Sequence, residues 1–317
     1  MNATTEVTES PTATEVLAGL ARNPKEISPK YFYDRKGSEL FEAIVDLDEY
    51  YLPDVEKSIF TKHRDEICET IGKGKTLVEP GAGSCEKVKW LLPQLEPAAY
   101  VPMDISAEHL QASAGHLSEA FPDIDVTPQV CDHTRGIELN GHVADAPAVF
   151  FYPGSSVGNF EPEQAVDFMH AIRQHVHAEA QGQGGLLIGV DTKKDIDVLH
   201  AAYDDSQGVT AEFNANVMDN LNHLLDGDLD REKFEHHVIY NEDQGRIEMH
   251  LRCTEQHSAQ LAGERIEFAE GELIHTENSY KYHPEEFIKL AERAGFAHRK
   301  LWQDERGWFA VMYFEPA

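Results

Sequence analysis

A glycine pair, Gly81 and Gly83, follows the apolar run at 76–79 and is the most informative chemical pattern in the sequence. Glycine has no Cβ, so the backbone amides of such a turn can approach a nucleotide-like cofactor closely. A dinucleotide fingerprint would carry a further glycine at position 86, which is Glu86 here. The turn alone therefore leaves both an ordinary tight turn and a cofactor site open.

Two carboxylates follow at the ends of the next apolar runs. Asp104 ends the run at 100–104, where a carboxylate can accept hydrogen bonds from ribose hydroxyls. Asp132 follows the run at 125–131 and could meet an adenine edge in the same way. Lys87 could reach a carboxylate of the cofactor. Strand-end carboxylates and surface lysines are also common without any ligand, so each of these roles has an ordinary alternative.

A loop of small residues, 152–160, follows the fourth apolar run and contains Gly154 and Asn159. In an α/β sheet the loops at the carboxyl ends of the strands face the ligand, so this loop lies where cofactor and substrate would meet. Asn159 has a second interpretation, as a cap for the helix expected near Pro162.

Metal binding and covalent hydrolysis are not expected. The acidic run at 226–230 opens like a calcium loop, but the twelfth position, which would need a bidentate glutamate, is His237. The histidines lack the spacing of a zinc site. The sequence also has no Gly-x-Ser-x-Gly elbow.

Charge and cysteine content restrict the partners and the compartment. The 317 residues include 57 acidic and 27 basic side chains, for a formal charge of −30, which disfavours nucleic acids and anionic membranes. Four scattered cysteines indicate a reducing cytoplasm. No apolar run is long enough for a membrane span, and no signal peptide is evident. The sequence is compatible with a cytoplasmic monomer.

Short apolar runs alternate with helical stretches from residue 76 onward. The runs lie at 76–79, 100–104, 125–131, 148–152 and 186–190, with helices expected at 106–120 and 162–177. Such alternation predicts an α/β fold with a parallel sheet covered by helices on both faces.

The C-terminal part favours one cofactor over another. A helix at 284–294 precedes strands at 299–302 and 308–314, which predicts an antiparallel hairpin closing the sheet. This Rossmann-like arrangement is typical of class I methyltransferases that use S-adenosylmethionine (SAM), and dinucleotide dehydrogenases generally lack it. The methyltransferase spacing would place a third glycine at position 85, which is Cys85 in this sequence.

We expect a flexible tail and two lobes. Residues 1–14 have almost nothing to bury and predict the tail. The alternation stops in the middle of the chain, where a helical stretch at 197–225 precedes strand-like runs at 237–240, 246–252 and 265–268. We therefore assign 15–60 and 196–283 to a smaller α+β substrate-binding lobe, and 61–195 and 284–317 to the SAM-binding domain.

With these features the chain resembles the histidine-specific Nα-methyltransferases of ergothioneine biosynthesis, over nearly its whole length from about residue 26. The matching blocks occur in one order, at 31–41, 49–51, 78–87, 101–105, 154–160, 189–191, 202–205, 208–211, 246–249 and 276–279. The resemblance implies transfer of methyl groups from SAM to the α-amino group of L-histidine. Three rounds would give Nα-trimethylhistidine (hercynine), with no metal required.

The resemblance also implies roles for individual residues. The cofactor-binding positions are Gly81, Lys87, Asp104, Asp132 and His133, the last standing where an aromatic residue is usual. The substrate's α-amino and α-carboxylate groups would be held by Asn159 and Tyr203, with Gly154 nearby and Tyr33 beside the amine. The imidazole would lie among Tyr50, Met249, Glu277 and Ser279. Tyr33 and Asn159 are thus the candidate catalytic residues.

Three alternatives remain open at the level of sequence. One is a methyltransferase for another amino acid or amine on the same scaffold. The second, a nicotinamide-dependent oxidoreductase, is disfavoured by Glu86 and by the terminal hairpin. The third is a sensor that binds SAM or histidine without turnover.

Overall fold

The computed structural model describes residues 10–133, 136–139, 147–176 and 184–317. The chain forms two compact units, each built from two segments. The smaller unit comprises Met1–Tyr51 and Lys194–Ser279, and the sheet unit comprises Leu52–Lys193 and Tyr280–Ala317. The first change of unit comes after Tyr51 rather than near residue 60, because the long helix α4 (Leu52–Ile71) packs on strands of the sheet unit.

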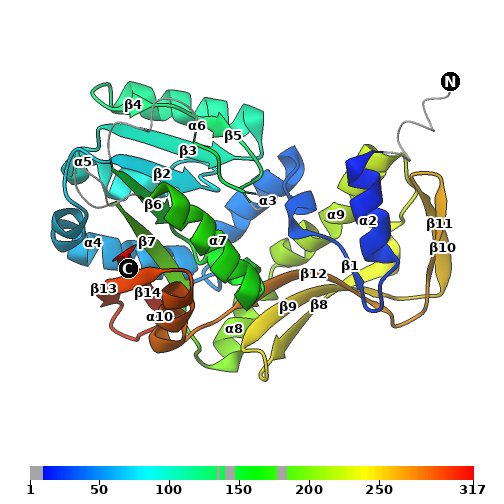
Figure 1. Cartoon of the computed structure of the whole chain (residues 1–317). Coiled ribbons are helices and arrows are strands. Elements are labelled where there is room, and N and C mark those ends of the chain that lie inside the picture. Colours follow the sequence, from blue (N-terminus) through cyan, green and yellow to red (C-terminus); the bar gives the residue numbers. More distant parts are fainter. Residues whose placement is uncertain (1–9, 134–135, 140–146, 177–183) are drawn as a thin grey trace. The chain divides into compact units, whose positions relative to one another are not determined.

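The sheet unit is built on an eight-stranded sheet whose central strands are parallel (Figure 1). The strand order is β13-β14-β7-β6-β2-β3-β4, and β5 also pairs with β3. The parallel strands are β2 (Thr76–Pro80), β3 (Ala99–Asp104), β4 (Asp125–Val126), β5 (Gln129–Val130), β6 (Ala148–Tyr152) and β7 (Gly185–Asp191). The run expected at 125–131 is thus two short strands, interrupted at Pro128, which has no backbone N–H for a ladder.

An antiparallel hairpin closes one edge of this sheet. Strand β13 (Phe296–Gln303) pairs with β14 (Phe309–Pro316), and β14 runs antiparallel to β7. The α/β fold class and the terminal hairpin expected from the sequence are therefore confirmed.

Helices cover both faces of the sheet because successive strand residues point to opposite sides. Phe150 joins the core formed with α7 (Pro162–His175) and α10 (Pro284–Arg293). The ring of Phe151 lies 5.8 Å from that of Phe60 on α4. The described residues of this unit also form α5 (Leu92–Leu95), α6 (Ala107–Ala120), η2 (Lys87–Trp90) and η5 (Ser156–Asn159).

The smaller unit packs helices against a four-stranded sheet of order β1-β12-β9-β8. These strands are β1 (Lys25–Glu26), β12 (Leu273–Tyr280), β9 (Arg246–Cys253) and β8 (Phe234–Asn241). A separate hairpin contains β10 (His257–Leu261) and β11 (Glu264–Phe268). The helices are α2 (Pro11–Leu20), η1 (Pro29–Phe32), α3 (Arg35–Val45), α8 (Ile196–Tyr203), α9 (Val209–Leu225) and η6 (Arg231–Lys233).

The stretch expected to be helical at 197–225 is two helices rather than one. The Asp205 carboxylate accepts hydrogen bonds from the backbone N–H groups of Gln207, Val209 and Thr210, which ends α8 and starts α9. Gly208 between them has φ +74°, a conformation that favours glycine.

The N-terminal boundary also differs from the expectation. Residues 11–14, placed in the tail, form the first turn of α2, where the Ser10 hydroxyl accepts a hydrogen bond from the Ala13 N–H. Residues 1–9 and His177 lie outside the described residues. Helix α4 and strands β10 and β12 were not predicted.

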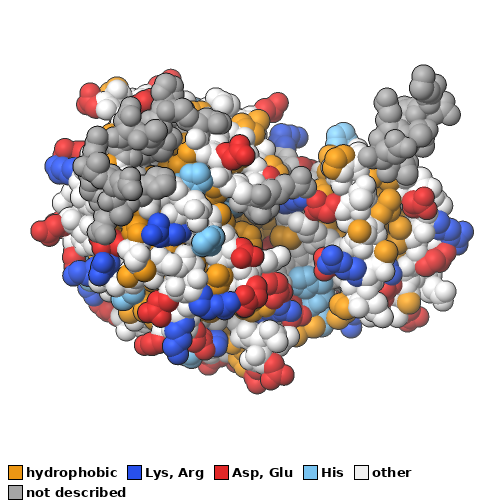
Figure 2. Space-filling view, in the orientation of Figure 1, with side chains coloured by type: hydrophobic (Ala, Val, Ile, Leu, Met, Phe, Trp, Pro, Cys, Tyr) orange, Lys and Arg blue, Asp and Glu red, His pale blue; other side chains and the backbone are white. Residues whose placement is uncertain are grey.

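Acidic and basic side chains are interspersed over the face of the molecule drawn in Figure 2, with acidic ones in excess across the sequence. Among the described helices, none combines the length and the apolar character that crossing a membrane requires.

A buried ion pair joins the last residue of β7 to Lys281, the residue that follows β12. Lys281 Nζ lies 2.8 Å from an oxygen of Asp191, the last residue of β7, and both side chains are wholly buried. The backbone N–H of Tyr282 also donates to the Asp191 carbonyl oxygen. Taking two charges out of water is costly, so each needs the other once both are buried.

We expect Lys281→Met to lower the free energy of unfolding by about 3–5 kcal/mol, because it leaves the buried Asp191 carboxylate without its cation. The three tryptophans, Trp90, Trp302 and Trp308, all belong to this unit, so their fluorescence during urea unfolding measures it directly. The control is Lys300→Met, which removes a half-exposed partner of Glu66 and should change the midpoint far less. Equal midpoints for the two variants would contradict the role of the buried pair.

Candidate functional site

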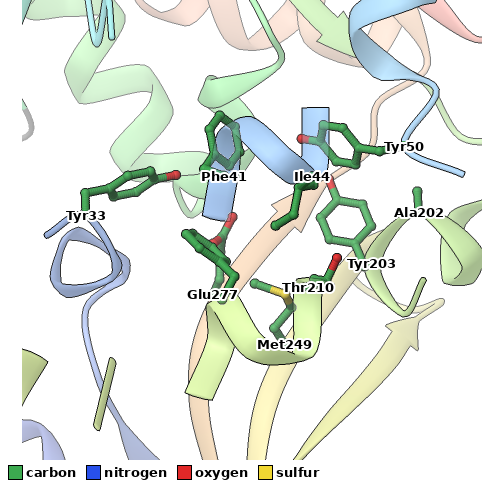
Figure 3. A pocket seen from close by; sticks show the side chains of 10 residues that line it. Tyr33, Phe41, Ile44, Tyr50, Ala202, Tyr203, Thr210, Met249 and Glu277 are labelled. Atoms are coloured by element: carbon green, nitrogen blue, oxygen red, sulfur yellow. The ribbon is translucent and has the colours of Figure 1, made fainter. Parts of the chain in front are cut away.

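The smaller unit contains a small cavity, lined by ten residues that all belong to this unit. Seven segments of the unit contribute side chains to its wall. In Figure 3 Tyr33 lies on one side of the cavity, Tyr50 and Tyr203 lie on the other, and Met249 and Glu277 lie between them. The other lining residues are Phe41, Ile44, Ala202, Thr210 and Phe213.

Five of the ten residues in this wall are aromatic. Tyr33, Phe41 and Phe213 lie in mutual contact, with ring centroids 5.8–6.0 Å apart. Tyr50 and Tyr203 meet edge to face at 6.1 Å. Rings at these distances and tilts attract one another and hold a rigid shape, so the cavity suits a planar or cationic ligand group.

Among the residues that line the cavity, Glu277 is the one with an acidic side chain. Glu277 is 9% exposed and comes from β12, next to Met249 of β9 at 2%. The Tyr203 hydroxyl lies 2.7 Å from the Ser279 hydroxyl, which belongs to the same strand as Glu277. A carboxylate in such an apolar setting is a strong acceptor for a ligand N–H.

The sheet unit holds the glycine turn at the end of β2. Gly81 and Gly83 have φ +68° and +51°, and Cys85 shares this left-handed region with φ +56°. The position where methyltransferase spacing calls for glycine therefore does adopt a glycine-like conformation. A Cβ on Gly81 would lie 3.4 Å from the His133 ring, and one on Gly83 would meet only open space.

The Asp104 carboxylate stabilises the glycine turn through hydrogen bonds to backbone N–H groups. One oxygen of Asp104 accepts from the Gly83 N–H at 3.0 Å and the other from the Ser106 N–H at 2.9 Å. Asp132 and His133 follow β5. Burial lowers the pKa of His133, so its ring is neutral at pH 7 and presents a flat, weakly polar surface to the turn.

A buried glutamate that sequence reasoning missed connects this turn to the loop after β6. Glu56 on α4 is wholly buried, accepts a hydrogen bond from the Gly154 N–H at 2.8 Å, and pairs with Lys87 Nζ at 2.8 Å. Glu56 occupies an apolar position in the helical pattern that Leu52, Val55 and Ile59 set. An acidic residue at an apolar position of the helix was the feature of the sequence that could have revealed Glu56.

The loop after β6 is fixed at several points. Ser155 has φ +59°, and its hydroxyl accepts a hydrogen bond from the Asp191 N–H. A Cβ on Gly158 would lie 2.8 Å from the Tyr280 carbonyl oxygen, so the loop backbone packs directly on that strand end. The N-cap of α7 is Glu161 rather than Asn159, which excludes the capping interpretation of Asn159.

The residues expected to bind substrate thus fall into two groups. Tyr33, Tyr50, Tyr203, Met249 and Glu277 line one cavity, and Ser279 reaches it through Tyr203. Gly154 and Asn159 belong to the sheet unit, with the expected cofactor residues Gly81, Lys87, Asp104, Asp132 and His133. Phe41, Ile44, Ala202, Thr210 and Phe213 were not predicted as site residues.

Comparison with known proteins gives a consistent family. Residues 12–316 match the family described as histidine-specific methyltransferase, SAM-dependent. A histidine N-alpha-methyltransferase of Mycolicibacterium smegmatis is 36% identical over 94% of this chain and 92% of its own length. One of Mycobacterium tuberculosis is 33% identical over the same shares of the two chains. Ergothioneine biosynthesis protein 1 of Neurospora crassa is 28% identical over 88% of this chain and 32% of its own length.

The family match spans nearly the whole chain, and two relatives exceed 30% identity over more than nine tenths of it. Both the sheet with its terminal hairpin and the cavity-bearing smaller unit lie within the matched residues. The chain therefore belongs to the SAM-dependent, histidine-specific methyltransferase family.

Proposed function

We propose that this protein transfers methyl groups from SAM to the α-amino group of L-histidine, three times in succession, to form hercynine for ergothioneine biosynthesis. The observation that carries the proposal is the cavity, in which the Glu277 carboxylate stands among aromatic rings in a chain of this family. The names of the relatives support the choice of histidine and of the pathway.

In this proposal the imidazole occupies the cavity of the smaller unit. Its N–H donates to Glu277, and Tyr50, Met249 and Ser279 surround the ring. A site that hydrogen-bonds a substrate N–H discriminates against analogues that lack this group, because they forfeit the hydrogen bond. Glu277 therefore selects histidine over an apolar amino acid of similar size.

The sheet unit fits SAM through the chemistry of its own residues. The open backbone at Gly83 admits close approach of a ligand, and Asp104 and Asp132 offer acceptors for ribose hydroxyls and the adenine edge. The neutral His133 ring suits contact with an adenine face, and Lys87 suits a carboxylate. When bound, SAM supplies an electrophilic methyl group.

The residues of the protein then need to orient the amine rather than activate it chemically. An α-amine with a pKa near 8 is about one-tenth neutral at pH 7, which costs about 1.4 kcal/mol. Correct placement of the lone pair is worth up to roughly 7–11 kcal/mol. Positioning by Tyr33, Tyr203, Asn159 and Gly154 is therefore the larger effect, and no strong general acid is needed.

A panel of amino acids tests the proposal. Purified protein is incubated with SAM and each amino acid, and mass spectrometry follows gains of one, two or three methyl groups. We expect three methyl groups on L-histidine and none on leucine or phenylalanine. Methylation of another amino acid in preference to histidine, or binding without methyl transfer, would contradict it.

Replacing the cavity carboxylate tests the imidazole site. We expect Glu277→Ala to raise KM for L-histidine by about 10- to 100-fold, since a charge-assisted hydrogen bond is lost. SAM affinity, measured by calorimetry, should change little. Glu264→Ala, which removes an exposed carboxylate on the hairpin of the same unit, is the control. A wild-type KM in the Glu277 variant would refute this assignment.

Asn159→Ala tests the role of the loop after β6. Because Glu161 caps α7, loss of the Asn159 amide should leave the unfolding midpoint nearly unchanged. Turnover should fall about 100-fold or more if Asn159 positions the amine. The result that counts against this role is undiminished methylation in a stable variant.

A further inference from the structure

Helix α9 carries three buried asparagines whose side chains reach different parts of the cavity wall. Asn214 and Asn216 are wholly buried and Asn220 is 8% exposed. Asn216 donates to the Asp34 carboxylate and Asn220 to the Tyr31 carbonyl oxygen, each at 2.8 Å, on either side of Tyr33. Amides are buried at tolerable cost only when they are hydrogen-bonded, so these contacts fix α9 to the segment that presents Tyr33.

Asn214 makes the most extensive of these connections. Its Nδ2 group donates to the His250 carbonyl oxygen at 2.9 Å and to His236 Nδ1 at 2.8 Å. Its Oδ1 atom accepts from the Thr276 hydroxyl at 2.8 Å. The Thr276 oxygen also lies 3.0 Å from the Met249 carbonyl oxygen, so its single hydrogen is shared between two acceptors. One side chain on α9 thereby contacts β8, β9 and β12.

The direction of the hydrogen bonds through His236 follows from its partners. His236 Nε2 lies 2.8 Å from the Tyr203 carbonyl oxygen, which can only accept, so Nε2 carries the hydrogen. Nδ1 is then the acceptor for the Asn214 amide. Burial lowers the pKa of His236, which favours this neutral form.

Two of the three branches from Asn214 end at the backbone of a cavity residue, and the third ends at the carbonyl of His250, which follows Met249. One reaches the carbonyl of Tyr203 through His236, one reaches the carbonyl of Met249 through Thr276, and Thr276 directly precedes Glu277. Tyr203, Met249 and Glu277 come from three separate elements, α8, β9 and β12. Asn214 does not line the cavity itself.

We propose that Asn214 is a positioning residue for the substrate, which sets the separation of Tyr203, Met249 and Glu277 through His236 and Thr276. The proposal rests on the proposed function, in which these three residues hold L-histidine. According to this proposal, Asn214 affects histidine binding and selectivity in addition to any contribution that it makes to the stability of the fold.

Asn214→Leu removes the amide at similar size. We expect KM for L-histidine to rise about tenfold or more, the effect of losing a set of buried hydrogen bonds. Histidine binding measured by calorimetry should weaken in parallel, and the Kd of S-adenosylhomocysteine should stay within about twofold of wild type.

A variant elsewhere on α9 separates positioning from stability. Asn222 exchanges two hydrogen bonds with the backbone of Leu229, away from the cavity. Asn222→Leu should lower the thermal unfolding midpoint, followed by circular dichroism, but leave KM for histidine unchanged. Equal KM values in the Asn214 and Asn222 variants would overturn the proposal.

If Asn214→Leu does not fold, two variants of His236 test the proposal instead. His236→Gln keeps a donor for Tyr203 and an acceptor for Asn214, whereas His236→Leu has neither. We expect the histidine KM of the Gln variant to lie close to wild type and that of the Leu variant to rise, and identical values would overturn the proposal.

Wild-type protein is assayed alongside these variants. If it does not methylate histidine, the proposed function fails and the inference with it, whereas an active wild type with unchanged variants refutes the inference alone.

Discussion

The wholly buried Glu56 carboxylate joins three segments of the sheet unit. Lys87 Nζ and the Gly154 N–H compensate the charge, which ties α4 to both loops at the carboxyl edge of the sheet. The same arrangement accounts for two glycines. A Cβ on Gly189 would lie 2.4 Å from Glu56 Oε1, and one on Gly154 would lie 2.6 Å from Lys87 Nζ. A side chain at either position would displace one member of this pair, and Gly154 also has φ +78°, which favours glycine.

The smaller unit combines a largely apolar cavity wall with the carboxylate of Glu277. Aromatic contacts among Tyr33, Phe41 and Phe213 supply the wall. The buried amides of α9 supply the polar support behind it. Hydrophobic packing alone fixes spacing only loosely, whereas hydrogen bonds to backbone carbonyls fix direction as well. In the function that we propose, selectivity for a planar, N–H-bearing ring depends on both.

Periodicity predicted the elements of the sheet unit well, since buried parallel strands are short apolar runs between helices. The runs at 76–79 and 148–152 lie within a residue of β2 and β6. Strand β12 was not predicted, because its buried residues include Thr276, Glu277, Asn278 and Ser279, which break the apolar pattern of a core strand. Phe41 and Phe213 were missed for the opposite reason: aromatic residues at helical spacing usually indicate packing, and only the fold brings them to the site.

The order of the strands has a consequence for synthesis of the protein. Strand β14 lies between β7 and β13 in the sheet, yet the whole of the second segment of the smaller unit separates β7 from β14 along the chain. On the ribosome, β7 therefore presents an unpaired edge with fully buried residues while more than a hundred later residues are added. An exposed apolar edge is a template for intermolecular pairing. The nascent chain thus has a long interval in which binding by a chaperone would protect it from aggregation.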